Sequence, residues 1–298
     1  MLRFIKKIIL FTLLFFAVNY AYLLIIENYN YDFKKSIEAV NMKHQNYSCL
    51  ALGNSLVMDG IDTEFLTKKG LPSYNFAIGG ANLKSNYIQL IHYLENNENP
   101  KFVLLGTASL NSLKRKKSDE AIHPIIEYNY KPFDWLNYKN LPMIKFRWIS
   151  IEMLKLLVSS DHRKAEVVHG QYKTKRQVGD KTGFKNKSNK QINLKALIEN
   201  KYLSKIDSIC KKNDIRFLVF EMPGYKKSQN SMDIGPFNLK NKKNDISFIN
   251  LNNHNLCSEL FNDNSDWLGN SHLNEYGAEK LTNYIFEEFL SQNLNNIK

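Results

Sequence analysis

Short apolar runs that alternate with amphipathic segments constrain the fold of this chain more than any other feature. Five runs have the length of buried strands: residues 48–53, 74–78, 101–106, 215–220 and 246–251. Apolar residues dominate each run without a two-residue alternation, which is typical of strands that are covered on both faces. A sheet built from such strands needs helices on both of its sides.

Helical patterns fill the intervals between these runs. Asp62 is placed to cap a short helix that ends near Lys69, and an apolar stripe follows along residues 83–94. A long amphipathic helix is predicted over residues 194–210, and a last helix over residues 274–290. Strands that alternate with helices imply a parallel sheet. We therefore predict an α/β three-layer sandwich around a mostly parallel five-stranded sheet.

An uncharged segment, residues 8–26, lies close to the N-terminus. Its length suits a helix that crosses a hydrocarbon core of roughly 30 Å. Basic residues within positions 1–7 precede it and Glu27 follows it. The positive-inside rule then predicts a single-pass anchor with a cytoplasmic N-terminus and an extracytoplasmic remainder. A cleaved signal peptide is the alternative, but the apolar segment is long for one, so we favour an uncleaved anchor.

The length of 298 residues suits one catalytic domain with an appendage. We expect this domain to span residues 48–291, after a polar stalk over residues 27–47. Between Leu113 and Gln191 the periodic pattern weakens, so residues 113–191 are interpreted as an insertion that forms a lid or accessory surface. Residues 292–298 are expected to form a tail.

The net charge of +12 is concentrated in residues 163–190, where nine lysines and arginines face two acidic residues. We interpret this stretch as a solvated loop; the alternative is a surface that meets lipid headgroups or an acidic polymer. No segment resembles a nucleic-acid-binding module. The three cysteines lack the spacing of metal ligands or of a disulfide framework, and Cys49 and Cys210 lie in apolar patterns typical of a core. We expect no metal and no cofactor.

Open parallel sheets place their active sites at the carboxyl ends of the strands. Ser55 follows the first predicted strand, Gly79 follows the second, and His272 precedes the last helix. Taken singly, these residues also suit a helix cap, a tight turn and a surface histidine. Their order along one strand–helix frame is more specific than any one of them.

Together the blocks resemble the SGNH, or GDSL-like, hydrolase superfamily, especially its membrane-anchored bacterial branch associated with the acylation of envelope polysaccharides. The blocks are Leu52–Leu56, Asn75–Asn82 and Ser271–Gly277, and the resemblance spans most of residues 48–291 apart from the insertion. The family pattern implies that Ser55 is the nucleophile, that His272 is its base, and that Gly79 supplies an oxyanion-hole N–H.

Two positions depart from the family pattern. The family usually has an aspartate three residues before the histidine, where this chain has Gly269, and an asparagine two residues after the third block's glycine, where it has Ala108. Asp266 is therefore predicted to replace the orienting acid, with Asp263 as a weaker alternative. Asn82 or Asn111 is predicted to replace the missing oxyanion donor.

The resemblance implies a serine-dependent acyl-ester hydrolase or O-acyltransferase that acts on an extracytoplasmic envelope glycan. Envelope polysaccharide machinery is the implied partner. The alternative function is a catalytically silent SGNH-like domain that binds glycan or scaffolds an envelope assembly, and Gly269 and Ala108 favour it. An unrelated flavodoxin-like sheet is a third possibility, disfavoured because no multi-residue phosphate-binding loop follows the first strand.

Overall fold

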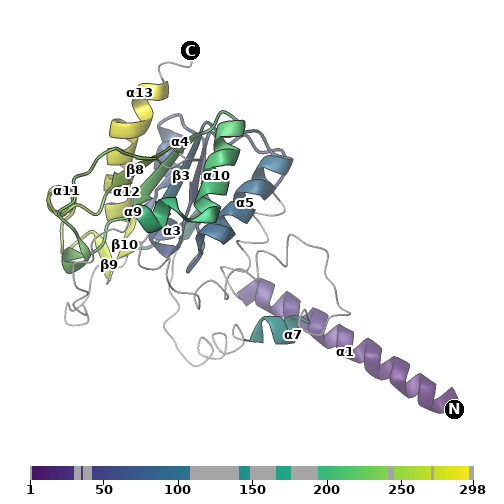
Figure 1. Cartoon of the computed structure of the whole chain (residues 1–298). Helices are drawn as coiled ribbons and strands as arrows, with labels where there is room; N and C mark the ends of the chain where they lie inside the picture. The colour runs from purple at the N-terminus through teal and green to yellow at the C-terminus, as the bar shows by residue number, and fades with distance from the viewer. Residues whose placement is uncertain are drawn as a thin grey trace. The chain divides into compact units, whose positions relative to one another are not determined.

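The computed structural model describes residues 2–29, 35, 42–107, 141–147, 166–175, 194–240, 245–269 and 272–294 (Figure 1). The chain divides into two compact units. The larger unit comprises residues 42–123 and 163–298, and the smaller unit comprises residues 1–41 and 124–162.

The larger unit is built on a sheet with the strand order β2-β1-β3-β6-β8-β7. Its strands are β1 (Cys49–Leu52), β2 (Ser73–Asn75), β3 (Phe102–Thr107), β6 (Arg216–Glu221), β7 (Phe237–Lys240) and β8 (Asp245–Asn250). All neighbours pair in parallel except β7, which pairs antiparallel with β8 at the edge. The fold is therefore mixed α/β with a mostly parallel sheet, as predicted.

The five predicted strands are all present, but the predicted count of five is wrong because β7 adds a sixth. Every residue of the central strand β3 is buried, which explains its continuous apolar run. In β7 only Leu239 is buried, while Asn238 and Lys240 are exposed. Its sequence, FNLK, therefore lacks the apolar run by which the other strands were found.

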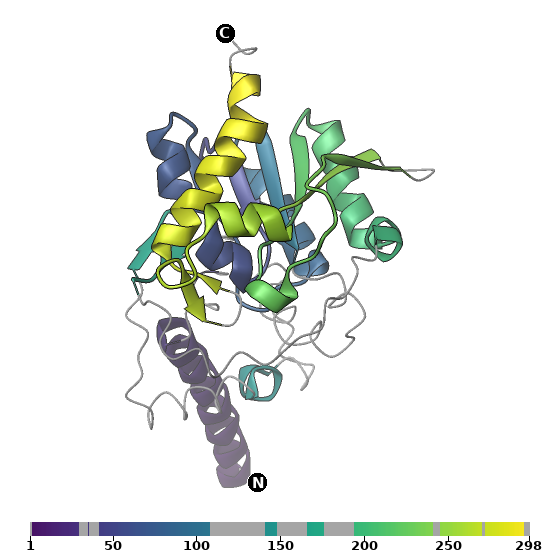
Figure 2. The same ribbon diagram turned by 90° about the vertical axis from the view of Figure 1, so that its left-hand side faces the viewer.

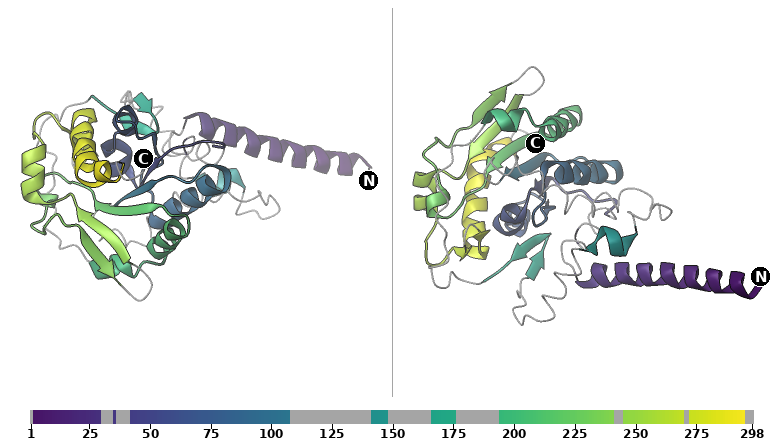
Figure 3. Two further views of the ribbon diagram at one scale, coloured as in Figure 1. Left: turned by 90° about the horizontal axis from the view of Figure 1, so that it is seen from above. Right: turned by 60° about the horizontal axis from the view of Figure 1, so that its bottom comes forward.

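Helices cover both faces of the sheet (Figures 2 and 3). The helical elements of this unit are α3 (Ser55–Gly60), α4 (Thr63–Lys68), α5 (Leu83–Asn96), α9 (Leu194–Ile198), α10 (Lys201–Lys212), the 3₁₀ turn η4 (Lys226–Ser228), α11 (His254–Leu260), α12 (Glu275–Ile285), the π-helical turn η5 (Phe286–Leu290) and α13 (Ser291–Leu294). Helices α5 and α10 pack together on one face, whereas α12 packs against α3 and α4 on the other.

The single long helix predicted over residues 194–210 is two helices in the structure. Asn200 lies between α9 and α10, and its side-chain oxygen accepts hydrogen bonds from the N–H groups of Tyr202 and Leu203. Asparagine is a strong N-cap residue, so it starts a new helix here instead of continuing the previous one. The predicted cap at Asp62 is confirmed, since its carboxylate accepts from the N–H of Phe65.

The last part of the predicted stalk belongs to the larger unit. The main chain of His44 donates to the carbonyl of Asn96, and the N–H of Gln45 donates to the side chain of Asn97. The N–H of Tyr47 donates to the hydroxyl of Tyr93. These bonds tie residues before β1 to the end of α5, so the domain begins earlier than residue 48.

Part of the basic stretch is a β-hairpin and not the solvated loop that we expected. Strands β4 (Glu166–Val168) and β5 (Gln171–Lys173) pair antiparallel, and Gln171 is fully buried. Gly170 has φ +79°, and a Cβ there would overlap the carbonyl of Asn75. The close approach of the two backbones therefore requires glycine.

Lys173 forms ion pairs with two carboxylates near the start of α4. Its Nζ lies 3.2 Å from Asp62 Oδ2 and 2.6 Å from Glu64 Oε2. Hydrogen bonds from Lys173 and Lys68 lower the pKa of Glu64 to about 2. Burial acts to lower the pKa of Lys173, but the two carboxylates outweigh it and raise that pKa. The positive charge of Lys173 is thus paired with carboxylates of the same unit.

The smaller unit contains α1 (Leu2–Tyr29) and the short helix α7 (Pro142–Lys145). Asn19, a polar residue within the apolar helix, accepts a hydrogen bond from the N–H of Met143, and the hydroxyl of Tyr22 donates to the carbonyl of Phe146. The segment Leu2–Ile26 is long and apolar enough to cross a membrane, a property that a signal sequence would share.

Two glycines let α3 pack directly on the sheet. A Cβ at Gly53 or at Gly106 would overlap the side chain of Val57, and the one at Gly106 would also lie 2.8 Å from Met222 Cγ. Because these strand ends lack side chains, the short helix that begins at Ser55 lies close to β1 and β3.

We expect Gly106→Ala to lower the free energy of unfolding by about 1–3 kcal/mol, because the added methyl group overpacks the contact with Val57. Urea denaturation of the detergent-solubilised protein measures the change. Gly60→Ala is the control, since its Cβ would first meet the flexible end of Met222 at 3.2 Å. An equal loss of stability in both variants would contradict the packing argument.

Candidate functional site

Ser55 is the first residue of α3, at the carboxyl end of β1. The side chain of Asn54 caps this helix by accepting a hydrogen bond of 3.0 Å from the N–H of Leu56. Asn54 therefore serves as the N-cap of the helix that carries Ser55. The turn from strand to helix places Ser55 at the edge of the sheet, as the sequence predicted.

His272 reaches Ser55 from a small antiparallel hairpin. Its strands are β9 (Trp267–Gly269) and β10 (His272–Leu273). His272 Nε2 lies 3.4 Å from Ser55 Oγ, a long hydrogen bond of the kind that is common in unliganded active sites. The imidazole is 32% exposed. The predicted pairing of serine and histidine is present.

The carboxylate that contacts His272 is Asp59, a residue that we did not predict. His272 Nδ1 forms a short hydrogen bond with Asp59 Oδ2. A carboxylate oxygen that accepts from Nδ1 favours the neutral tautomer in which the lone pair is on Nε2, the ring atom beside Ser55 Oγ. Asp59 lies in the last turn of α3 and its side chain is only 2% exposed.

Asp266, the predicted acid, forms no hydrogen bond or ion pair with His272 and has other partners. One of its carboxylate oxygens accepts from the hydroxyl of Ser265, and the other accepts from the main chain of Asn262 and from Lys280 Nζ, at 2.6–2.8 Å. Its own carbonyl accepts from the N–H of Asn274. These bonds give Asp266 a structural role in the loop before His272.

The bonding of Asp59 differs from that of Asp266. Its Oδ1 is buried and has no hydrogen-bond partner among the residues that the structure describes, so His272 is the one described side chain that pairs with this carboxylate.

A signal for Asp59 was present in the sequence. Residues four apart on a helix share a face, and Asp59 follows Ser55 by four positions within an otherwise apolar helix.

The two other positions that we weighed for the acid have different surroundings. Gly269, where the family usually has aspartate, lies directly opposite His272 in the β9–β10 pairing. Asp263, the weaker alternative, forms an ion pair of 2.6 Å with Lys226. Neither supplies a carboxylate to the imidazole.

Two of the three predicted oxyanion residues, Gly79 and Asn82, follow β2 at the same end of the sheet as Ser55. Gly79 follows β2 within a turn that the hydrogen bond from Ala81 N to the carbonyl of Ile78 closes. The side chain of Asn82 accepts from the N–H of Ser85 and caps α5. Asn111 and Ala108 lie outside the described residues. The roles of Gly79 and Asn82 in binding an oxyanion stay predictions.

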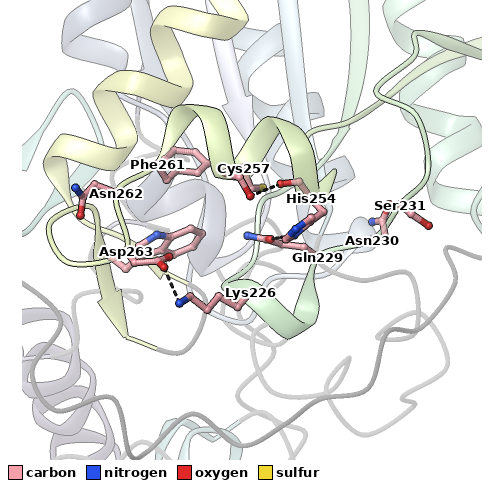
Figure 4. A pocket seen from close by; sticks show the side chains of 11 residues that line it. Lys226, Gln229, Asn230, Ser231, His254, Cys257, Phe261, Asn262 and Asp263 are labelled. Carbon is pink, nitrogen blue, oxygen red and sulfur yellow. Dashed lines mark hydrogen bonds and ion pairs between the residues drawn. The ribbon is translucent and has the colours of Figure 1, made fainter.

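A cavity of about 950 Å³ opens beside the β9–β10 hairpin, which carries His272 (Figure 4). Its lining comes from segments that follow β6 and β8, and from Trp267 on β9. It comprises Lys226, Gln229, Asn230, Ser231, His254, Cys257, Ser258, Phe261, Asn262, Asp263 and Trp267. The ion pair between Lys226 and Asp263 joins two of these segments. Trp267 pairs with Leu273, the residue next to His272, so one hairpin serves both the cavity and the serine–histidine pair.

Two side chains of the cavity are held in fixed orientations. Gln229 Nε2 donates to the carbonyl of Gly224, so its Oε1 is the acceptor for His254 Nδ1 at 3.0 Å. The indole N–H of Trp267 is buried and has no hydrogen-bond partner among the described residues. The cavity therefore offers amide, hydroxyl and aromatic groups with little net charge.

The three cysteines are core residues with protonated thiols. All three are buried and free, and burial raises the pKa of each of the thiols of Cys49, Cys210 and Cys257 to about 12. The prediction that Cys49 and Cys210 are core residues is confirmed. Within the described part of the chain, no group of three or more histidine, cysteine or acidic residues is arranged to hold a metal ion.

No protein-family model matches this sequence, and no curated protein matches it. The resemblance to SGNH hydrolases thus rests on the three sequence blocks, beside which the geometry of Ser55, His272 and Asp59 stands as an independent observation.

We expect Asp59→Asn to slow the labelling of Ser55 by a fluorophosphonate about 10³- to 10⁴-fold, because the amide can hold the wrong imidazole tautomer and carries no charge. Labelling rates of the detergent-solubilised protein measure the effect. Asp266→Asn is the matched control. It should lower stability by about 1–3 kcal/mol, through a weakened buried network, with little change in the labelling rate of the folded protein. The reverse pattern would assign the catalytic acid to Asp266.

Proposed function

We propose that this protein is a serine-dependent acyl-ester hydrolase or O-acyltransferase of the SGNH type. The observation that carries the proposal is the array of Ser55, His272 and Asp59, in which each side chain contacts the next. Nucleophile, base and orienting acid in this order form the arrangement that activates a serine for acyl transfer.

In the first half-reaction, the proton of Ser55 Oγ moves to His272 Nε2 while the oxygen attacks the carbonyl carbon of the ester. The resulting tetrahedral oxyanion collapses and expels the alkoxide, which takes the proton from the imidazolium and leaves as an alcohol. Asp59 stabilises the imidazolium that exists between these two steps. The product on the enzyme is an acyl ester of Ser55.

In the second half-reaction, His272 removes a proton from an incoming hydroxyl group. If that group is water, Ser55 is released with a free carboxylic acid and the protein is an esterase. If it is a sugar hydroxyl, the acyl group is transferred and the protein is an O-acyltransferase. The same three residues serve both outcomes.

The main-chain N–H groups of Ser55 and Gly79 are the proposed donors to the oxyanion. Both residues follow the carboxyl ends of adjacent parallel strands, β1 and β2. Loss of one oxyanion donor typically costs about 10²–10³ in rate, so a hole with two donors still supports catalysis. Asn82 is better explained as the cap of α5.

The proposed substrate is an acylated glycan outside the cytoplasm. The N-terminal apolar helix supports a single-pass membrane anchor, with the basic residues before it on the cytoplasmic side. The cavity beside β9 supports a polyhydroxylated ligand, because its lining is rich in amide and hydroxyl groups next to aromatic rings. Envelope polysaccharide machinery is the proposed partner.

The alternative, a silent domain that only binds glycan or scaffolds an assembly, has less support. It relies on Gly269 and Ala108, where family residues are missing. A domain without catalysis has no need to bury the carboxylate of Asp59 against an imidazole, since burying a charge is costly unless it is paired. The pairing of Asp59 with His272 therefore favours an enzyme.

We expect the purified protein to hydrolyse 4-nitrophenyl acetate and to be labelled by a fluorophosphonate at Ser55. Ser55→Ala should abolish labelling and reduce the rate of hydrolysis at least about 10³-fold, because no nucleophile remains to form the acyl-enzyme. Mass spectrometry of the labelled peptide locates the modified residue. Wild-type and Ser55→Ala proteins that behave alike in both assays would disprove the proposed function.

The proposed anchor predicts that a C-terminally tagged protein stays in the membrane pellet after extraction with alkaline carbonate, because an apolar helix of this length partitions into the bilayer. Immunoblotting of pellet and supernatant measures the distribution. A soluble, shortened protein would show that the apolar segment is a cleaved signal peptide.

A further inference from the structure

The β4–β5 hairpin touches the helix that carries both Ser55 and Asp59. Gln171, the first residue of β5, is fully buried, and its Nε2 donates to the main-chain carbonyl of Asp59 over 3.3 Å. This hairpin comes from within the predicted insertion, far along the sequence from the three catalytic blocks.

The carbonyl of Asp59 needs a partner from outside its helix. The last four carbonyl groups of a helix have no intrahelical donor, and α3 is only six residues long. Asn75 Nδ2 donates to the carbonyls of Val57 and Ile61 on either side. Gln171 supplies the donor for Asp59, so the end of the helix is held by two side-chain amides.

The hairpin is itself fastened to the catalytic region. His169 lies in the turn between β4 and β5. Its carbonyl accepts from the hydroxyl of Thr63 and from the N–H of Asn75, each at 2.9 Å. Beyond β5, the carbonyl of Thr174 accepts from the N–H of Glu275, in the first turn of α12. With the ion pairs of Lys173, these bonds join the hairpin to the segments that follow β1, β2 and His272.

We propose that the β4–β5 hairpin is the element that positions the catalytic acid, and that Gln171 is a positioning residue for Asp59. This inference rests on the proposed acyl-transfer function. Among the described side chains, His272 is the one hydrogen-bond partner of the Asp59 carboxylate. The direction of this carboxylate therefore depends on His272 and on the main chain of α3, and Gln171 bonds to that main chain at the carbonyl of Asp59 itself.

The proposal gives the insertion a role in catalysis beyond that of a lid. The hairpin lies within the predicted insertion, which begins after β3 ends at Thr107. Without the hairpin, the carbonyl of Asp59 would lose its donor and the end of α3 could shift. A displacement of about 1 Å in a catalytic array can cost about 100-fold in rate.

The test is Gln171→Met in the full-length, detergent-solubilised protein, which removes the amide but keeps the length of the side chain. We expect kcat for 4-nitrophenyl acetate to fall between about tenfold and 100-fold with KM nearly unchanged, because the acid is displaced while the ester-binding surface is not. The rate of fluorophosphonate labelling at Ser55 should fall by the same factor.

Gln89→Met is the matched control. Gln89 is 3% exposed on α5, and its Nε2 donates to the carbonyl of Phe76 over 2.9 Å, so it makes the same kind of buried bond away from Asp59. Both variants should lose similar stability in urea denaturation, but only Gln171→Met should lose kcat. Equal losses of kcat in the two variants would overturn the proposal, since a general loss of rigidity would then explain them.

A double-mutant cycle separates positioning from other roles. In the Asp59→Asn background, Gln171→Met should lower kcat by less than about twofold, because residues that act as one unit are not additive. A full additional loss in that background would overturn the positioning role. If instead Ser55→Ala retains the wild-type rate, the proposed function fails, whereas an unchanged kcat in Gln171→Met with a Ser55-dependent rate refutes only the role of the hairpin.

Discussion

The buried carboxylate of Asp59 is the constraint on which the arrangement of the site depends. A charge in the interior is tolerated only when it is paired, and here the partner is the imidazole of His272. Meeting that requirement brings the end of α3 and the β9–β10 hairpin together. Along the chain these two elements are far apart, because most strands of the sheet lie between them in sequence. Ser55, one helical turn before Asp59, then comes within reach of the same imidazole.

Close packing makes that arrangement possible. The helix α3 begins directly after β1 and lies against β1 and β3, where Gly53 and Gly106 leave room for Val57. Because the helix has only six residues, most of its terminal carbonyl groups need donors from elsewhere. Asn75 and Gln171 supply them, so the short helix that carries Ser55 is held by side chains from two other parts of the chain.

Asp266 is near His272 in the sequence and Asp59 is near it in space, and the two carboxylates have different bonding partners. Asp266 is close to His272 along the chain, yet its oxygens are occupied by Ser265, Asn262 and Lys280. It shapes the loop that presents the hairpin. Asp59 is distant along the chain and carries the contact with the imidazole. A family motif read along the sequence favours the near residue, because distance along the chain is the only distance that a sequence displays.

The sequence by itself determined the mostly parallel sheet, its five predicted strands, and the positions of Ser55 and His272 next to strand and helix ends. These features depend on local patterns: continuous apolar runs, helix caps, and turns at strand ends. Tertiary structure decided the sixth strand and the docked hairpin in the basic stretch, and it showed that Asp59, whose only signal in the sequence was its spacing from Ser55, is the partner of His272. The strand β7 buries only Leu239, the hairpin docks through Gln171 and Lys173, and a carboxylate contacts an imidazole that is distant along the chain only when folding brings the two together.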